Sequence, residues 1–332
     1  MDRRQFVKRS AAVSAAAALP NAANIFAEPP AKRPNVLYIF SDQHRAASLP
    51  GEPFDQAIAP TLERFRRENL SMDACISNYP LCTPHRGILI SGLYSWQSQV
   101  VHNGQTLEPR QPGLGDAFRA AGYHTGYIGK WHLYEGENKF VPKGPYRFGF
   151  EDWQVWANTN KHYDGITFNP ETGERITMPG YQPTRMTDQA LDFIQKQKGA
   201  DKPWFLVLSW NPPHPPFDPP AEDSDKYNAP ALKLRPNVRL STPADKITNP
   251  YPQLESLETL RQAEQGYYGA ITAIDKEFER LLKALDENGM AGDTIVVYTS
   301  DHGEMMGSHA TWPSRCRMKN PAMCRSSFVY PG

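Results

Sequence analysis

Three apolar runs constrain the fold of this 332-residue chain more than any other feature of its sequence. They occupy residues 36–41, 204–209 and 294–299. Continuous apolar runs of this length are typical of strands buried on both faces, as in parallel sheets that helices cover from both sides. We therefore predict an α/β fold with a mostly parallel central sheet and helices on both faces of that sheet.

Polar side chains follow each of these predicted strands. The segments are Asp42-Gln43-His44-Arg45, Asn211-Pro212-Pro213-His214 and Ser300-Asp301-His302-Gly303. Open α/β sheets bind their ligands beyond the carboxyl ends of the strands. We therefore expect the functional residues at that edge of the sheet.

Two of the segments offer ligands for a divalent metal ion. The pairs Asp42-Gln43 and Asp301-His302 combine carboxylates, an amide oxygen and an imidazole. Carboxylate and amide oxygens suit Ca²⁺ or Mg²⁺, whereas an imidazole widens the choice toward Mn²⁺ or Zn²⁺. Taken alone, either pair is more often turn chemistry or a helix cap.

Helices and loops separate the predicted strands. Apolar residues recur at helical spacing between Tyr268 and Leu285, and Asn288-Gly289 provides a stop signal. Residues 154–185, rich in Asn, Tyr, Thr and Gly, are interpreted as an insertion over the site. Residues 215–253, rich in proline and charge, are interpreted as a long loop.

Cys82 opens the run Cys82-Thr83-Pro84-His85-Arg86. Proline suits the first turn of a helix, so Cys82 is expected at or just before a helix N-terminus, where the dipole favours an anion. Arg86, four residues on, would add a fixed positive charge beside residue 82. Two alternatives remain open at this point: an inert buried thiol and, in an exported chain, a disulfide with Cys75.

Lys130 and His132 supply further candidates for binding an oxyanion. Being two residues apart, they would project to one side of an extended stretch, where the lysine holds anionic oxygens and the imidazole handles a proton. His214 lies between prolines. The alternatives are a solvated lysine and histidines that are hydrogen-bonded within the protein.

Several residues around these motifs are candidates for substrate contact. Trp131, Trp153 and Trp156 would either stack on a sugar face or belong to the core. A second group flanks the expected site and would read a carboxylate or a hydroxyl of a glycan: His44, Arg45 and His85.

The ordered set of motifs resembles the catalytic core of a type I sulfatase of the alkaline phosphatase superfamily, over about residues 33–304. The matching segments are the strand followed by Asp42, the Cys-x-Pro-x-Arg run at Cys82, the Gly-Tyr-x-Thr-x-x-x-Gly-Lys-x-His run that ends at His132, the Pro-Pro-His run at His214, and the Ser-Asp-His-Gly run at Asp301. The resemblance implies that Cys82 is oxidised to formylglycine, whose hydrate attacks the sulfur of a sulfate ester.

Site roles follow from the same resemblance, position by position. Asp42, Gln43, Asp301 and His302 would hold one divalent metal ion together with modified Cys82, Ca²⁺ being preferred over Mg²⁺ or Mn²⁺. Arg86 would stabilise the formylglycine, Lys130 would bridge sulfate and nucleophile, His132 would help the sulfated intermediate collapse, and His214 would contact the leaving oxygen. Many relatives have Asp at the position of Gln43 and Asn at that of His302, which leaves the identity of the metal open.

The function implied is hydrolysis of a sulfated carbohydrate or of an aryl or alkyl sulfate, after modification by a formylglycine-generating maturase. Two alternatives are a phosphonate monoester or phosphodiester hydrolase on the same fold, and a catalytically silent protein that binds sulfated glycans and in which Cys82 stays unmodified. Because Lys+Arg and Asp+Glu each number 36, the net charge implies no nucleic-acid partner.

The N-terminus is interpreted as an export signal. Arg3-Arg4-Gln5-Phe6-Val7-Lys8 matches the twin-arginine pattern, and an alanine-rich stretch leads to a cleavage site after Ala27. We therefore expect residues 1–27 to be removed and the protein to reach the periplasm or the medium through the twin-arginine export machinery. No apolar run is long enough for an ordinary membrane span.

The C-terminal part of the chain departs from the family pattern. Residues 28–332 are interpreted as a catalytic domain that is incomplete at its C-terminus, with the small C-terminal subdomain largely missing. A lysine followed by Tyr-Glu is expected after Ser-Asp-His-Gly and is not found. Restoring one adenine after Pro313 regenerates such a sequence, so residues 314–327 are interpreted as frame-shifted, and Cys316, Lys319 and Cys324 as artefacts.

Overall fold

The computed structural model describes residues 33–72, 74–135, 139–156, 161–242 and 256–310, together with the backbone of 327–329. The predicted signal peptide, residues 1–27, therefore lies outside the described residues. The predicted frame-shifted segment also lies outside them, apart from the backbone of Ser327.

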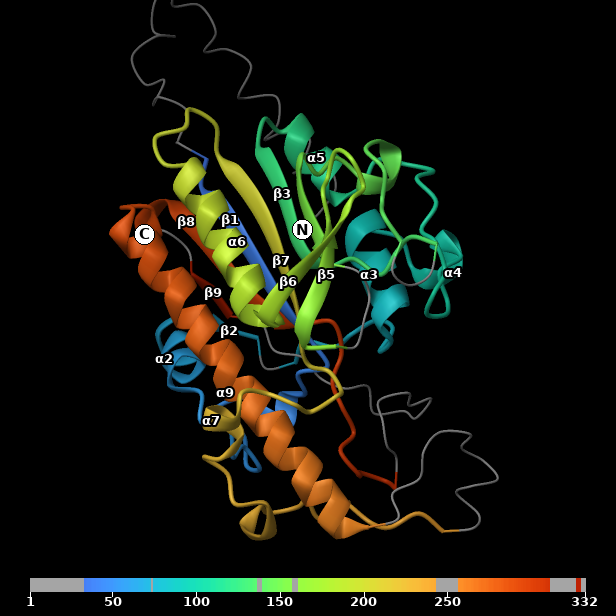
Figure 1. Cartoon of the computed structure of the whole chain (residues 1–332), viewed down its shortest axis with the longest axis vertical. Helices are drawn as coiled ribbons and strands as arrows, with labels where there is room; N and C mark the ends of the chain where they lie inside the picture. Colours follow the sequence, from blue (N-terminus) through green and yellow to red (C-terminus); the bar gives the residue numbers. More distant parts are fainter. Residues whose placement is uncertain are drawn as a thin grey trace, which may run out of the picture. The chain divides into compact units, whose positions relative to one another are not determined.

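A single central sheet organises the described chain (Figure 1). Its strand order is β2-β9-β8-β1-β7-β3-β4-β5-β6. The strands span Asn35–Asp42 (β1), Leu70–Ser71 (β2), His124–Lys130 (β3), Asp152–Trp156 (β4), Tyr163–Phe168 (β5), Arg175–Tyr181 (β6), Trp204–Pro213 (β7), Thr294–Ser300 (β8) and Ser327–Val329 (β9). The central strands β8, β1, β7, β3 and β4 are parallel, whereas β2, β9, β5 and β6 pair antiparallel at the two ends.

Helices cover both faces of this sheet, as predicted. The α-helices span Pro60–Glu68 (α2), Cys82–Ser91 (α3), Ser95–Ser98 (α4), Leu114–Ala120 (α5), Gln182–Lys196 (α6), Ala221–Ser224 (α7) and Leu257–Glu287 (α9), and 3₁₀ turns span Ala46–Ser48, Pro145–Arg147, Ala229–Ala231 and Ala291–Asp293. Figure 1 shows α6 and α9 lying side by side across one face of the sheet.

The two faces bury separate hydrophobic clusters because side chains alternate along β1. Leu37 and Ile39 pack with residues of α2, α6 and α9 on one face. Phe40 faces the opposite way and packs with Ile90 of α3, while Phe118 of α5 borders that second cluster. A strand with apolar side chains on both faces buries all of them only when helices cover both sides of the sheet. This is why the three apolar runs of the sequence become the central strands β1, β7 and β8.

Two predictions for the connecting segments need correction. Residues 154–185, interpreted as an insertion, largely extend the sheet through β5 and β6 and then begin α6. Gly165 permits this arrangement, because a Cβ there would lie 2.1 Å from the Trp156 ring. The predicted loop over 215–253 contains the short helix α7 and one 3₁₀ turn, and its residues 243–253 lie outside the described part.

Candidate active site

The carboxyl ends of the parallel strands bring the sequence-predicted residues together. Asp42 ends β1, and Asp301 directly follows β8. Asp42 is paired in register with Pro213 of β7, the residue before His214, and Lys130 is the last residue of β3. The described part of the chain therefore places its polar motifs at the edge of the sheet where α/β proteins bind ligands.

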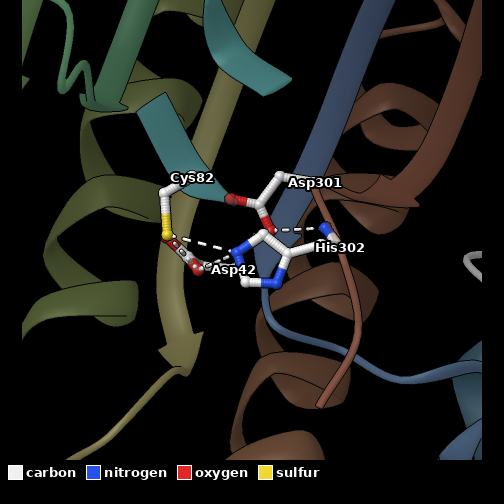
Figure 2. Close-up of side chains that lie close together, drawn as sticks. All are labelled: Asp42, Cys82, Asp301 and His302. Carbon is white, nitrogen blue, oxygen red and sulfur yellow. Dashed lines mark hydrogen bonds and ion pairs between the residues drawn. The ribbon is translucent and has the colours of Figure 1, made fainter. Parts of the chain in front are cut away.

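Four of these side chains form one buried cluster. The ligand atoms of Asp42, Cys82, Asp301 and His302 all lie within 4.8 Å of one another. Figure 2 shows the four side chains converging from β1, from the start of α3 and from the segment after β8. All four are buried, so the cluster excludes most of the water that would otherwise solvate its charges.

Cys82 occupies the first turn of α3, as predicted from Pro84. Its Sγ lies 3.4 Å from Asp42 Oδ1 and 3.2 Å from His302 Nε2. An inert structural thiol would instead be surrounded by apolar groups. Cys82 also carries no disulfide bond, so the alternative pairing with Cys75 is not formed.

Two buried cations balance the two buried carboxylates. Arg86 Nη2 lies 3.1 Å from Asp42 Oδ2 and 3.3 Å from Asp301 Oδ2, and Lys130 Nζ lies 2.6 Å from Asp42 Oδ2. Burial alone would raise the pKa of Asp42, but the charges of Lys130 and Arg86 hold it well below its usual value. The pKa values of Lys130 and Arg86 are raised against the effect of burial, chiefly by Asp42 and Asp301 respectively. Both cations therefore remain charged.

Arg86 is fixed by more than ion pairs. Its Nη1 donates to the Lys130 carbonyl at 2.6 Å and to Ser209 Oγ at 2.8 Å. Strands β3 and β7 approach closely here because Gly129 has φ 105°, and a Cβ at that position would lie 2.1 Å from the Ser209 carbonyl oxygen. The glycine thus allows the two strand ends to hold the guanidinium between them.

His302 is oriented for ligation through Nε2. Its Nδ1 lies 2.9 Å from the Gly303 carbonyl, which can only accept, so Nδ1 carries a hydrogen and Nε2 faces Cys82. Metal-binding histidines commonly donate their second N–H in this way. Despite burial, Asp301, Cys82 and Asp42 raise the pKa of His302 well above its usual value. A cation bound here would displace that proton, and two carboxylates with one imidazole fit a divalent ion.

Gln43 adjoins this cluster in a left-handed conformation, with φ 66°. Its backbone N–H donates to Asp301 Oδ1 at 3.1 Å, and its side-chain amide donates to Glu304. Its carbonyl accepts from Tyr267 Oη at 2.7 Å. The predicted ligand therefore lies beside the buried cluster.

His132 and His214 lie close enough to Lys130 to respond to its charge. Burial and Lys130 lower the pKa of His132 well below its usual value and that of His214 to about 3. The extended stretch predicted for Lys130 and His132 is wrong, because β3 ends at Lys130 and His132 adopts a left-handed φ of 60°. The composition of the motif does not reveal this turn.

His44 and Arg45, the predicted glycan contacts, bond to other residues of the protein. His44 Nδ1 lies 3.0 Å from Tyr298 Oη, and Arg45 Nη2 contacts Glu264 at 3.2 Å and Tyr268 Oη at 2.9 Å. Both side chains are at most 3 % exposed. These bonds support the loop after β1 from within, and contact of either residue with a glycan stays a prediction.

The side chains of the remaining candidates for substrate contact also pack against other residues of the protein. His85 contacts Ser77 Oγ at 3.0 Å. Trp131, Trp153 and Trp156 are buried, and the rings of Trp131 and Trp153 meet edge to face at 4.9 Å. These tryptophans are core residues, which was the alternative to sugar stacking.

Sequence reasoning missed several residues that hold the site. Ser209 supports Arg86, Asn103 Oδ1 accepts the Thr83 N–H at 3.0 Å, and Glu304 holds Gln43. Glu304 follows the Ser-Asp-His-Gly motif immediately, so its position was the available signal. Ser209 lies within β7, and Asn103 follows α4. Their proximity to the site depends on how these elements pack, which the sequence does not show.

Fold and site together define an α/β protein with a cluster of metal-ligand type at the carboxyl edge of its sheet. The sulfatase family model matches residues 34–327, so the chain belongs to the sulfatase family, within the alkaline phosphatase superfamily.

Individual relatives support this assignment. The chain is 32 % identical over 308 residues to an ulvan-active sulfatase of Formosa agariphila, and the match covers 90 % of this chain and 57 % of that protein. The structure of the sulfatase YidJ from Bacteroides fragilis matches with a TM-score of 0.80 at 26 % identity, covering 92 % of this chain and 70 % of that one. The phosphonate monoester hydrolase of Agrobacterium radiobacter shares the fold, with a TM-score of 0.72 at 22 % identity over 90 % of this chain and 68 % of that one.

Proposed function

We propose that the chain carries the catalytic core of an exported sulfuric ester hydrolase that acts on a sulfated carbohydrate. The observation that carries the proposal is the buried group of Asp42, Cys82, Asp301 and His302, with ligand atoms within 4.8 Å of one another. Membership of the sulfatase family supports the reaction class. Because the chain spans 57 % of its ulvan-active relative, the activity of the whole protein is part of the proposal.

The proposed reaction uses a modified residue 82 and a divalent metal ion. Residue 82, as formylglycine hydrate, would supply the oxygen nucleophile, and a divalent ion, Ca²⁺ in our proposal, would neutralise charge as that oxygen attacks sulfur. Asp42, Gln43, Asp301 and His302 would hold the ion. The donor set supports this assignment because the buried carboxylates of Asp42 and Asp301 each offer an oxygen to the same cluster, whose ligand atoms lie within 4.8 Å of one another.

The fixed cations Arg86 and Lys130 would bind the anionic reactants. Arg86 is 1 % exposed and Lys130 2 % exposed, and neither must desolvate again when an anion enters. Preorganised charges in a dry site stabilise developing negative charge more strongly than charges in water. We assign Arg86 to the nucleophile at residue 82 and Lys130 to the sulfate oxygens.

We assign His214 to protonation of the leaving-group oxygen. We assign His132 to proton transfer at residue 82 when the sulfated intermediate collapses. The Pro215 carbonyl lies 2.5 Å from His214 Nδ1 and can only accept, so the neutral ring keeps its hydrogen on Nδ1 and a lone pair on Nε2. His214 must therefore gain a proton before it acts as an acid. A bound sulfate ester would favour this, because its negative charge offsets the effect of Lys130 on the His214 pKa.

Export and maturation belong to the same proposal. Residues 1–27 would direct the folded protein through the twin-arginine machinery, and residues 28–332 would form the catalytic domain. Modification by a maturase would precede export. No helix among the described residues has both the length and the apolar character needed to cross a bilayer.

A phosphonate monoester hydrolase is the second candidate. Its support is the fold shared with the enzyme of Agrobacterium radiobacter, and tetrahedral phosphonates need similar cations. A silent binder of sulfated glycans is the third candidate, and it requires Cys82 to remain a thiol.

Steady-state hydrolysis tests the proposal directly. The chain, co-expressed with a maturase, is assayed on an aryl sulfate, an aryl phosphonate monoester and defined sulfated sugars. We expect sulfate release with the highest kcat/KM, and its loss in Cys82→Ala. Faster phosphonate hydrolysis would select the second candidate, and binding of sulfated sugars without turnover would select the third.

A further inference from the structure

Gln43 is held by three separate hydrogen bonds. Its backbone N–H donates to Asp301 Oδ1 at 3.1 Å, its carbonyl accepts from Tyr267 Oη at 2.7 Å, and its Nε2 donates to Glu304 Oε2. With φ 66° and 2 % exposure, the residue has few alternative conformations. Its backbone and its amide nitrogen are thus fixed independently of any ligand.

The two carboxylate oxygens of Glu304 accept hydrogen bonds from different groups. Oε1 accepts the backbone N–H of Met305 at 2.8 Å and that of Met306 at 3.3 Å, which anchors the side chain to its own turn. Oε2 accepts from Gln43 Nε2. Glu304 is 3 % exposed, so this contact is shielded from water.

The chemistry of the pair fixes the orientation of the amide. An ionised carboxylate only accepts hydrogen bonds, so the NH₂ of Gln43 must face Glu304 and Oε1 must point away from it. Among the described residues, Gln43 Oε1 accepts no hydrogen bond. An amide oxygen is a good ligand for a hard cation, whereas the NH₂ group is not.

We propose that Glu304 is a positioning residue that turns Gln43 Oε1 toward the metal ion of the Asp42–Cys82–Asp301–His302 cluster. The inference rests on the proposed function, because it takes Gln43 to be a ligand of that ion. A carboxylate at position 43 would need no such orientation, because either of its oxygens can bind a metal ion. The amide of Gln43 has only one ligand oxygen, and the hydrogen bond from its NH₂ group to Glu304 keeps that oxygen turned away from Glu304.

Calcium affinity measured by titration calorimetry tests this role without a catalytic assay. In Glu304→Gln the new amide either accepts from or donates to Gln43, so Gln43 is no longer held in one orientation. We expect the Kd for Ca²⁺ to rise by about 10- to 100-fold, as is typical when a group behind a metal ligand is changed. Glu304→Gln preserves the size of the side chain and an acceptor for Met305 and Met306.

A double-mutant cycle separates orientation from simple loss of charge. If Glu304 acts through Gln43, Glu304→Gln leaves the Kd unchanged in a Gln43→Ala background; a purely electrostatic effect persists there. Glu277→Gln serves as a matched control, because Glu277 is also buried but contacts Thr184 at 2.8 Å and Arg280 at 2.6 Å. We expect this control to bind Ca²⁺ like the parent.

The outcomes are distinguishable. A parent chain that binds Ca²⁺ equally well with and without Glu304→Gln overturns the positioning role and leaves the proposed function intact. An equal effect of Glu304→Gln in both backgrounds also overturns it. A parent chain that binds no divalent ion overturns the proposed metal centre, and the inference with it.

Discussion

Single side chains in this site depend on one another for charge balance. Lys130 and Arg86 are buried beside Asp42 and Asp301, so removing either cation leaves two carboxylates to share the remaining one in a dry environment. Breaking a buried pair from one side is far more costly than replacing both partners. A substitution at either position is therefore expected to change both the geometry of the site and the free energy of unfolding.

Lys130→Met tests that coupling. We expect the free energy of unfolding to fall by about 3 kcal/mol, because the Asp42 carboxylate loses the ammonium 2.6 Å away, and we expect sulfate release to be lost. Urea unfolding monitored by tryptophan fluorescence measures the first effect. The double variant Asp42→Asn, Lys130→Met should regain much of the stability and none of the activity. Equal stabilities of Lys130→Met and the parent would contradict this account.

Helices α2 and α9 are joined by a further buried carboxylate, which belongs to Asp275 and lies outside the metal-ligand cluster. Asp275 of α9 accepts the backbone N–H of Thr61 at 3.0 Å and that of Leu62 at 2.7 Å. These N–H groups belong to the first turn of α2 and have no acceptor within their own helix. Asp275 therefore caps α2 from outside, which compensates for Ala59, an N-cap residue without a side-chain acceptor.

The Asp275 contact predicts a pH-dependent term in stability. Burial raises the pKa of Asp275 to about 6, against the hydrogen bonds from Leu62 and Thr61. The folded state thus binds this proton more tightly than the unfolded state does. Its stabilising contribution is complete below about pH 4 and is lost as the pH rises through 6, by about 3 kcal/mol in total.

Asp275→Asn, which cannot titrate, measures that contribution. The stability of the parent minus that of Asp275→Asn should fall between pH 4 and pH 7, as determined by urea unfolding at each pH. Asp192→Asn, at an exposed position on α6, is the control and should show no such trend. A stability difference that rises with pH would contradict the raised pKa.

Across the whole molecule, local patterns predicted the central sheet well. The runs at 36–41, 204–209 and 294–299 are unbroken because both faces of β1, β7 and β8 are covered, so their sequence carries the fold directly. The position of Cys82 at the start of α3 was also predictable, because proline restricts where a helix begins.

What the sequence did not predict depends on contacts between distant segments. The strands β5 and β6 have little apolar periodicity, since they form the exposed end of the sheet. The burial of His44 and Arg45 depends on Tyr298 and Glu264, which are more than 200 residues away in the chain. Residue types identify a site, but only the assembled fold tells which of its neighbours face inward.

The chemical state of residue 82 tests the proposed function of the protein most directly. Mass spectrometry of the peptide that contains it, from the chain co-expressed with a formylglycine-generating maturase, reports the modification independently of substrate and metal. The account predicts that this peptide loses its sulfur and reacts with hydrazides as an aldehyde. An unmodified thiol in every molecule, under conditions that convert a control sulfatase, would contradict it.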